Sequence, residues 1–216
     1  MPTQTANKKI RLLLALRAAG ITDTRVLAAI ESVPRDTFVP EELKPQAWED
    51  TALPIGCGQT ISQPLVVATM TAALEPTDRD KVLEVGTGCG YQAAVLARLV
   101  RRVYTIERHK PLLQAAESRL ETLGVRNVTA ICGDGMAGWP AQAPFDKIIV
   151  TAAAHGEPPP VLLEQLKVGG HLVIPVGGQG EQVLRRYTKE SAEGAFAVKG
   201  LLPVRFVPLL PDVAGD

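Results

Sequence analysis

The chain has 216 residues, of which 46% are hydrophobic, so it can form one domain of ordinary size with a substantial core. Its 23 Lys and Arg residues balance its 23 Asp and Glu residues, which excludes the basic excess that nucleic-acid-binding proteins normally carry. Three scattered cysteines without a C-x-x-C pair exclude a disulfide framework and favour a reducing compartment, here the cytoplasm. The three histidines do not cluster, so we expect no metal site.

Two helices are expected at the N-terminus. Ile10, Leu13 and Leu14 recur at a spacing of three or four, which predicts an amphipathic helix ending at Gly20. A second helix is expected over residues 23–33, where the following proline cannot continue it. No apolar run is long enough to cross a membrane, so we expect no membrane partner.

The stretch from 34 to 62 shows little periodicity, and in a domain of this size so long an irregular segment is usually functional. It ends in Gln59, Thr60 and Ser62, just before a helix expected over residues 65–74. Amide and hydroxyl donors beside a helix N-terminus favour binding of a carboxylate. The alternative is an ordinary loop in which the serine caps the helix.

A glycine turn follows the next strand and organises the rest of the chain. The apolar run at 82–85 is too short for a helix and rich in valine, so it predicts a buried parallel strand. Gly86, Gly88 and Gly90 then permit a tight turn and a close approach of backbone to ligand. A helix is expected over residues 91–100. A strand, a glycine turn and a helix N-terminus form a ligand site at the carboxyl edge of a sheet.

Two acids indicate which ligand this turn binds. The pattern G-x-G-x-G differs from the G-x-G-x-x-G that receives a dinucleotide pyrophosphate. Glu84 would repel a pyrophosphate but suit an ammonium group. Glu107 ends a strand expected over residues 102–107, about twenty residues beyond the turn, where such folds bind a ribose. Together the acids favour S-adenosyl-L-methionine; the alternative is that both cap strands and face water.

Strands continue to alternate with helices, which predicts an α/β fold with a mainly parallel sheet and helices on both faces. Asp134, beyond the third strand, could accept a hydrogen bond from an adenine amino group or belong to a simple turn. A terminal hairpin-like addition is expected after Gly180. The elements expected from 111 onwards are a helix at 111–123, strands at 128–132 and 145–151, a helix from 158 to the glycines at 169–170, and strands at 171–175, 182–188 and 201–207.

Several motifs together resemble the protein-L-isoaspartate O-methyltransferase family. They are Gly-Gln-Thr-Ile-Ser-Gln-Pro at 58–64, Val-Leu-Glu-Val-Gly-Thr-Gly-Cys-Gly-Tyr-Gln at 82–92, Gly-Asp-Gly at 133–135 and Val-Arg-Phe-Val-Pro-Leu at 204–209. The resemblance covers nearly the whole chain in order, and the Gln-Thr-Ile-Ser segment is its most specific part. It implies a Rossmann-like class I S-adenosylmethionine-dependent methyltransferase fold in one domain, 1–216. Its parts would be N-terminal helices and substrate loop (1–75), cofactor-binding core (76–180), and C-terminal strands and substrate cover (181–216).

The resemblance also implies the reaction and the site. A methyl group passes from S-adenosyl-L-methionine to the free carboxylate of isoaspartyl residues in damaged proteins and peptides, which initiates their repair. Ser62 is then the active-site residue; we expect its hydroxyl to orient the carboxylate and not to act as a nucleophile. The implied cofactor-binding residues are Gln59, Thr60, Ile61, Ser62, Glu84, Gly86, Gly88, Cys89, Gly90, Glu107, Asp134 and Gly135. The implied substrate-binding residues are Thr60, Ile61, Ser62, Val207, Pro208 and Leu209.

The chain departs from some family members at three places: apolar residues at 65–67, Cys89 in the glycine turn, and Leu210 after the Val-Pro-Leu segment. These departures concern the finer polar contacts to cofactor and substrate, not the reaction type. Two other hypotheses stay open. One is a methyltransferase of the same fold that acts on a small molecule or RNA, and the other is a non-catalytic module that binds the adenosyl group. Balanced charge weighs against a nucleic-acid partner, and we expect a monomer that acts on isoaspartyl proteins and peptides.

Overall fold

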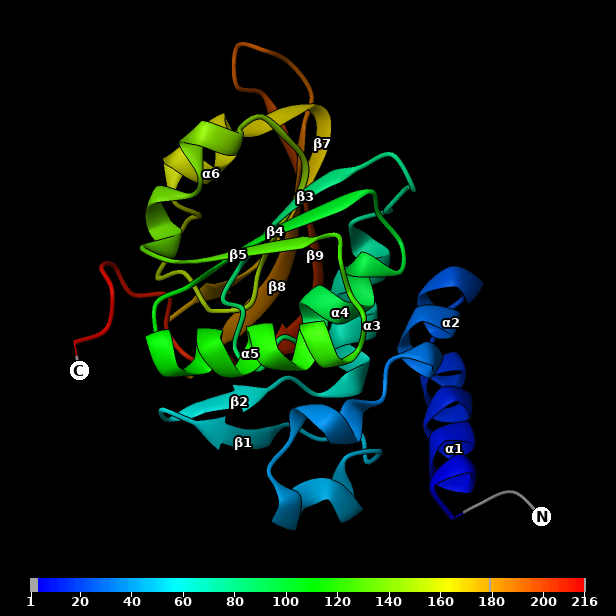
Figure 1. The fold of residues 1–216 in the computed structure, drawn as a ribbon. Helices are drawn as coiled ribbons and strands as arrows, with labels where there is room; N and C mark the ends of the chain where they lie inside the picture. Colours follow the sequence, from blue (N-terminus) through cyan, green and yellow to red (C-terminus); the bar gives the residue numbers. More distant parts are fainter. Residues whose placement is uncertain (1–3, 179, 216) are drawn as a thin grey trace.

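The computed structural model describes residues 4–178 and 180–215, and its centre is a seven-stranded sheet with helices on both faces (Figure 1). The strand order is β5-β4-β3-β6-β7-β8-β9. The five strands from β5 to β7 are parallel, while β8 and β9 each run antiparallel to the strand before. The strands are β3 (Lys81–Val85), β4 (Arg102–Glu107), β5 (Val128–Cys132), β6 (Phe145–Val150), β7 (Leu166–Gly177), β8 (Gln182–Lys189) and β9 (Phe196–Val204).

The strand β3 lies between β4 and β6, so the chain reverses its direction of travel across the sheet at β3. Ligands of open α/β sheets bind at such a reversal, beyond the carboxyl ends of the strands. The valines and isoleucines of β3, β4 and β6 are almost fully buried, as expected for strands covered on both faces. The fold therefore places its glycine turn, which follows β3, at the expected ligand site.

Helices pack on both faces of the sheet, and each face has its own hydrophobic core. The core on one face includes Val82, Val103 and Ile149 of the sheet together with residues of α1 to α5. The other face packs against α6, and its core includes Leu83 and Ile148. None of the described helices is both long and apolar enough to cross a membrane. The helices are α1 (Gln4–Ala18), α2 (Thr24–Ser32), α3 (Pro64–Ala73), α4 (Tyr91–Ala97), α5 (Lys110–Thr122) and α6 (Pro160–Glu164), with 3-10 turns η1 (Arg35–Phe38), η2 (Glu41–Gln46), η3 (Gly135–Ala137) and η4 (Pro140–Gln142).

Most expected elements are confirmed to within a few residues, but three regions differ. One is the last strand, expected over 201–207 and found at Phe196–Val204. The irregular stretch contains a small hairpin, β1 (Leu53–Gly56) paired antiparallel with β2 (Gln59–Ile61), which lies apart from the main sheet (Figure 1). The helix expected to run from 158 to 169–170 ends much earlier, at Glu164.

The glycines at 169–170 lie inside β7 and do not end a helix. The register between β6 and β7 shifts there, so that Phe145 pairs with Leu166 but Lys147 pairs with His171. A side chain at Gly170 would place its Cβ 2.7 Å from the carbonyl oxygen of Asp146. The glycine is needed because two backbones approach closely at an irregular part of the strand.

Candidate active site

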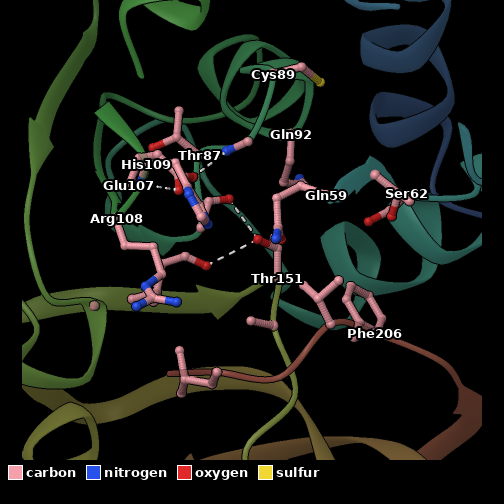
Figure 2. Close-up of a pocket in the computed structure, with 18 of the residues that line it drawn as sticks. Gln59, Ser62, Thr87, Cys89, Gln92, Glu107, Arg108, His109, Thr151 and Phe206 are labelled. Carbon is pink, nitrogen blue, oxygen red and sulfur yellow. Dashed lines mark hydrogen bonds between the residues drawn. The ribbon is translucent and has the colours of Figure 1, made fainter. Parts of the chain in front are cut away.

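A pocket opens beyond the carboxyl ends of β3, β4 and β6 (Figure 2). It is lined by segments that are far apart in the sequence: the turn after β3, the turn after β4, the β1–β2 hairpin and a segment near the C-terminus. In Figure 2, Glu107 and Arg108 lie on one side of it, and Ser62 and Phe206 on the other. The predicted site residues that line it are Gln59, Thr60, Ile61, Ser62, Gly86, Gly88, Cys89, Glu107, Gly135, Val207, Pro208 and Leu209.

The glycine turn after β3 is held by contacts with the two neighbouring strands, β4 and β6. Gly86 has a φ of +95° and donates its N–H to the carbonyl oxygen of Ile106 at 2.8 Å. The hydroxyl of Thr151, directly after β6, donates to the carbonyl oxygen of Gly86 at 2.6 Å. A Cβ on Gly86 would lie only 2.3 Å from that hydroxyl oxygen. Both the backbone conformation and the close contact therefore require glycine at this position.

Glu107 joins the two turns that flank the pocket. One carboxylate oxygen accepts the N–H of Gly88 at 2.8 Å, and the other accepts the N–H of His109 at 2.9 Å. The residue is only 4% exposed, yet it lines the pocket. Each carboxylate oxygen can accept a further hydrogen bond, so the pair can still receive two adjacent hydroxyl groups. This arrangement suits the ribose expected there.

Glu84 does not reach the pocket, contrary to the expectation that it faces an ammonium group. It is fully buried on the same face of the sheet as Val82. There the hydroxyl of Thr105 donates to its Oε2 at 2.5 Å. The Thr105 hydroxyl is also 2.7 Å from that of Thr87, which does line the pocket. Burial raises the pKa of Glu84 to about 8, while the bond from Thr105 lowers it and the charge of Glu107 raises it. Glu84 thus supports the pocket wall through two threonines.

This burial makes the stability contributed by Glu84 depend on pH. The side chain ionises near pH 4.5 in the unfolded chain but only near pH 8 in the folded protein. The folded state therefore holds one more proton between these values, and stability present below pH 4.5 is lost as pH rises towards 8. We expect Glu84→Gln, which can still accept from Thr105, to gain thermal stability relative to the parent protein between pH 5 and pH 8. Parallel curves of melting temperature against pH would contradict this, and the exposed Glu117→Gln is the control.

Gly90 and Asp134 also lie off the pocket wall. A Cβ on Gly90 would lie 3.2 Å from that of Ala116, so this glycine lets α5 pack against the start of α4. The Asp134 carboxylate accepts the N–H of Met136 at 2.8 Å and caps η3. Their contact with a cofactor stays a prediction.

The hairpin carries the Gln-Thr-Ile-Ser segment to the pocket. Leu53 pairs with Ile61, and the turn between the strands has positive φ at Gly56, Cys57 and Gly58. As a result the chain doubles back, and Ser62 follows directly after β2 at the pocket edge.

A C-terminal segment at 206–210 closes the pocket from another direction. Ala153, just beyond β6, donates its N–H to the carbonyl oxygen of Val207 and accepts from the N–H of Leu209, both at 2.8 Å. Further along, the Arg108 guanidinium donates to the carbonyl oxygens of Pro211 and Asp212, each at 3.2 Å. The segment is thus fastened to the turns after β4 and β6.

Sequence reasoning missed several residues of the pocket wall. Thr151, Arg108 and His109 stand directly after strand ends, which is the signal that could have found them. Phe206 and Gln92 carry no such signal. Phe206 reaches the pocket because its backbone N–H and carbonyl oxygen both bond the side-chain amide of Gln182.

Comparisons with known proteins agree with this geometry. A family model described as protein-L-isoaspartate(D-aspartate) O-methyltransferase matches residues 7–214. The protein-L-isoaspartate O-methyltransferase of Rhodospirillum centenum is 60% identical over 213 residues, which cover 98% of this chain and 96% of that protein. The corresponding protein of Rhodospirillum rubrum is 58% identical over 207 residues, covering 94% of this chain and 93% of that one.

Two solved structures share the whole fold. A protein-L-isoaspartate O-methyltransferase superposes with a TM-score of 0.85 at 27% identity, covering 95% of this chain and 67% of that chain. A Plasmodium falciparum structure described as a protein-L-isoaspartate O-methyltransferase in complex with S-adenosyl-L-homocysteine gives a TM-score of 0.80 at 26% identity. It covers 93% of this chain and 97% of that chain.

Proposed function

Because the chain belongs to the protein-L-isoaspartate(D-aspartate) O-methyltransferase family, we propose that it methylates the free carboxylate of isoaspartyl residues in damaged proteins and peptides. The methyl donor is S-adenosyl-L-methionine, and the ester formed allows return to normal aspartate through a succinimide. The protein is then a carboxyl O-methyltransferase that initiates repair. We also propose that it works as a monomer in the cytoplasm and binds no nucleic acid, which its balanced charge supports.

One observation carries the proposal: a single pocket contains both the glycine turn with Glu107 and the Gln-Thr-Ile-Ser segment. The first set of residues suits a nucleoside, because the Glu107 carboxylate has free acceptor capacity. The second set presents an amide and two hydroxyls where a carboxylate could enter. A methyltransferase of the same fold acting on RNA or a small molecule would have no need for that segment.

The residues present fit the donor. We assign the ribose hydroxyls to Glu107 and the close backbone approach to Gly86 and Gly88. Gly135 and Ile106, which also line the pocket, offer an apolar surface for a base. S-adenosyl-L-methionine supplies an activated methyl group on a sulfonium when bound.

The chain's own part in the reaction is to place the substrate. A carboxylate has a reference pKa near 4, so it is ionised at neutral pH and needs no general base. We assign to the Ser62 hydroxyl the role of donating a hydrogen bond that orients this carboxylate. The segment at 207–209, bonded to Ala153, limits the substrate's position from the other side. Correct positioning of two reactants can lower a barrier by roughly 7–11 kcal/mol, enough to make this the main source of catalysis.

The test compares two peptides of the same sequence, one with an isoaspartyl linkage and one with normal aspartate. With methyl-labelled S-adenosyl-L-methionine, we expect base-labile label on the isoaspartyl peptide and almost none on its partner. Label on both would show a carboxyl methyltransferase without selectivity for the damaged linkage. Label on neither peptide, while S-adenosyl-L-homocysteine still binds, would refute the proposed substrate. The remaining hypothesis would be a methyltransferase of the same fold that acts on a small molecule or RNA.

A further inference from the structure

The start of α3 is held by an acid from a distant part of the chain. Gln63 occupies the N-cap position but makes no side-chain cap bond, and Pro64 has no N–H to donate. The first free N–H of the helix, that of Leu65, donates to Asp50 Oδ1 at 2.8 Å. The side-chain amide of Gln63 donates to Asp50 Oδ2 at 3.0 Å. The two carboxylate oxygens of Asp50 therefore hold Gln63 and Leu65, one and three residues after Ser62.

Asp50 is itself held in place by a buried arginine. Arg35 is fully buried, and its Nε donates to the carbonyl oxygen of Ala47 at 2.8 Å. Its Nη2 donates to the carbonyl oxygen of Thr51 at 3.1 Å. The two acceptors lie on either side of Asp50 in the chain, so Arg35 fixes the short segment that presents the carboxylate.

The same arginine contacts Tyr91, the residue that follows the glycine turn. Its guanidinium carbon lies 5.1 Å from the ring centroid of Tyr91, and Phe38 packs edge-on against that ring at 5.4 Å. Tyr91 is the first residue of α4, follows Gly90 directly and lines the pocket. A continuous set of contacts therefore runs from the segment after Ser62 through Asp50 and Arg35 to the glycine turn.

We propose that Asp50 is a positioning residue that fixes the Ser62 hydroxyl relative to the glycine turn. The inference rests on the proposed function, since it assigns to Asp50 a part in methyl transfer. Asp50 does not line the pocket, so it acts through Gln63 and Leu65 and not by touching a reactant. Without it, the start of α3 loses two bonds and Ser62 becomes free to shift. A misplacement of about 1 Å can slow a reaction by about 100-fold.

The experiment compares Asp50→Ala with Asp50→Asn and with Asp23→Ala. Asp23 is a matched control because its carboxylate also holds the start of a helix, although from the N-cap position of α2 itself: it accepts from Arg25 N at 2.9 Å and Val26 N at 3.3 Å. Asparagine at position 50 can still accept from Leu65 N, and the Gln63 amide can rotate to meet its amide group. Each variant is measured for kcat and KM with an isoaspartyl peptide, affinity for S-adenosyl-L-homocysteine, and melting temperature.

We expect Asp50→Ala to lower kcat about 10- to 100-fold, with less than a twofold change in S-adenosyl-L-homocysteine affinity. Asp50→Asn should recover most of kcat, and Asp23→Ala should lower the melting temperature by a similar amount while leaving kcat unchanged. An unchanged kcat in Asp50→Ala would overturn the inference, as would an equal loss in Asp23→Ala or a parallel loss of S-adenosyl-L-homocysteine binding. Failure of the parent protein to label the peptide would refute the proposed function instead.

Discussion

Replacing Glu107 by alanine should weaken binding of S-adenosyl-L-homocysteine by about 100-fold or more. Hydrogen bonds to a charged group are worth about 1.5–3 kcal/mol each, and a ribose diol can make two of them with this carboxylate. The substitution also leaves the N–H groups of Gly88 and His109 without their acceptor, so both turns lose a constraint. Isothermal titration calorimetry would give the affinity directly.

The control for this prediction is Glu117→Ala, which removes an exposed carboxylate from α5. It tests whether the loss of one negative charge from the protein accounts for the effect. Glu107→Gln should give an intermediate loss of affinity. Its amide oxygen replaces one carboxylate acceptor, while its amide nitrogen stands in place of the second oxygen and can only donate. An affinity within twofold of the parent protein in Glu107→Ala would refute the assignment of the ribose to this residue.

Gly86→Ala should destabilise the fold and abolish donor binding. Its φ of +95° is strained for alanine, and the new Cβ would lie 2.3 Å from Thr151 Oγ1. Strain of this kind costs about 1–3 kcal/mol, and overpacking costs a similar amount. For a chain of this length, a total of roughly 2–6 kcal/mol corresponds to a fall in melting temperature of roughly 5–20 °C.

Gly20→Ala separates strain from steric overlap. Gly20 has nearly the same φ, +97°, but a Cβ there meets nothing within 4 Å. It should show only the smaller loss due to backbone strain, and donor binding should be normal. Adding Thr151→Ala to Gly86→Ala removes the clashing atom and should recover part of the lost stability. Equal melting temperatures for the two single variants would show that the contact with Thr151 has no energetic effect.

The central strands could be predicted from sequence because their signals are local and agree. The strand β4 occupies the expected residues, 102–107, and β3 ends with the predicted glycine turn. The β1–β2 hairpin could not be found, because strands of four and three residues are too short to show alternation. The glycines at 169–170 misled the prediction, because a glycine pair is as suited to an irregular strand as to a helix end.

The site could be predicted as a set of segments but not in the orientation of each side chain. Glu84 shows the reason: on a strand buried on both faces, sequence does not reveal which face a residue occupies. Asp50 shows another: its partners, Gln63 and Leu65, lie 13 and 15 residues away, and no local pattern links them. Such contacts arise from the tertiary fold alone.

The two segments that border the pocket limit which damaged proteins can be repaired. Because the Ser62 segment and the segment at 206–210 both line the pocket, the free carboxylate of the target residue must enter together with the backbone on either side of it. An isoaspartyl residue inside a rigid helix or a central strand cannot do this until that part of its protein opens. Apparent affinity falls with the open fraction, so an opening free energy of about 2.8 kcal/mol would weaken recognition about 100-fold. The enzyme would then act first on the loops and termini of aged proteins.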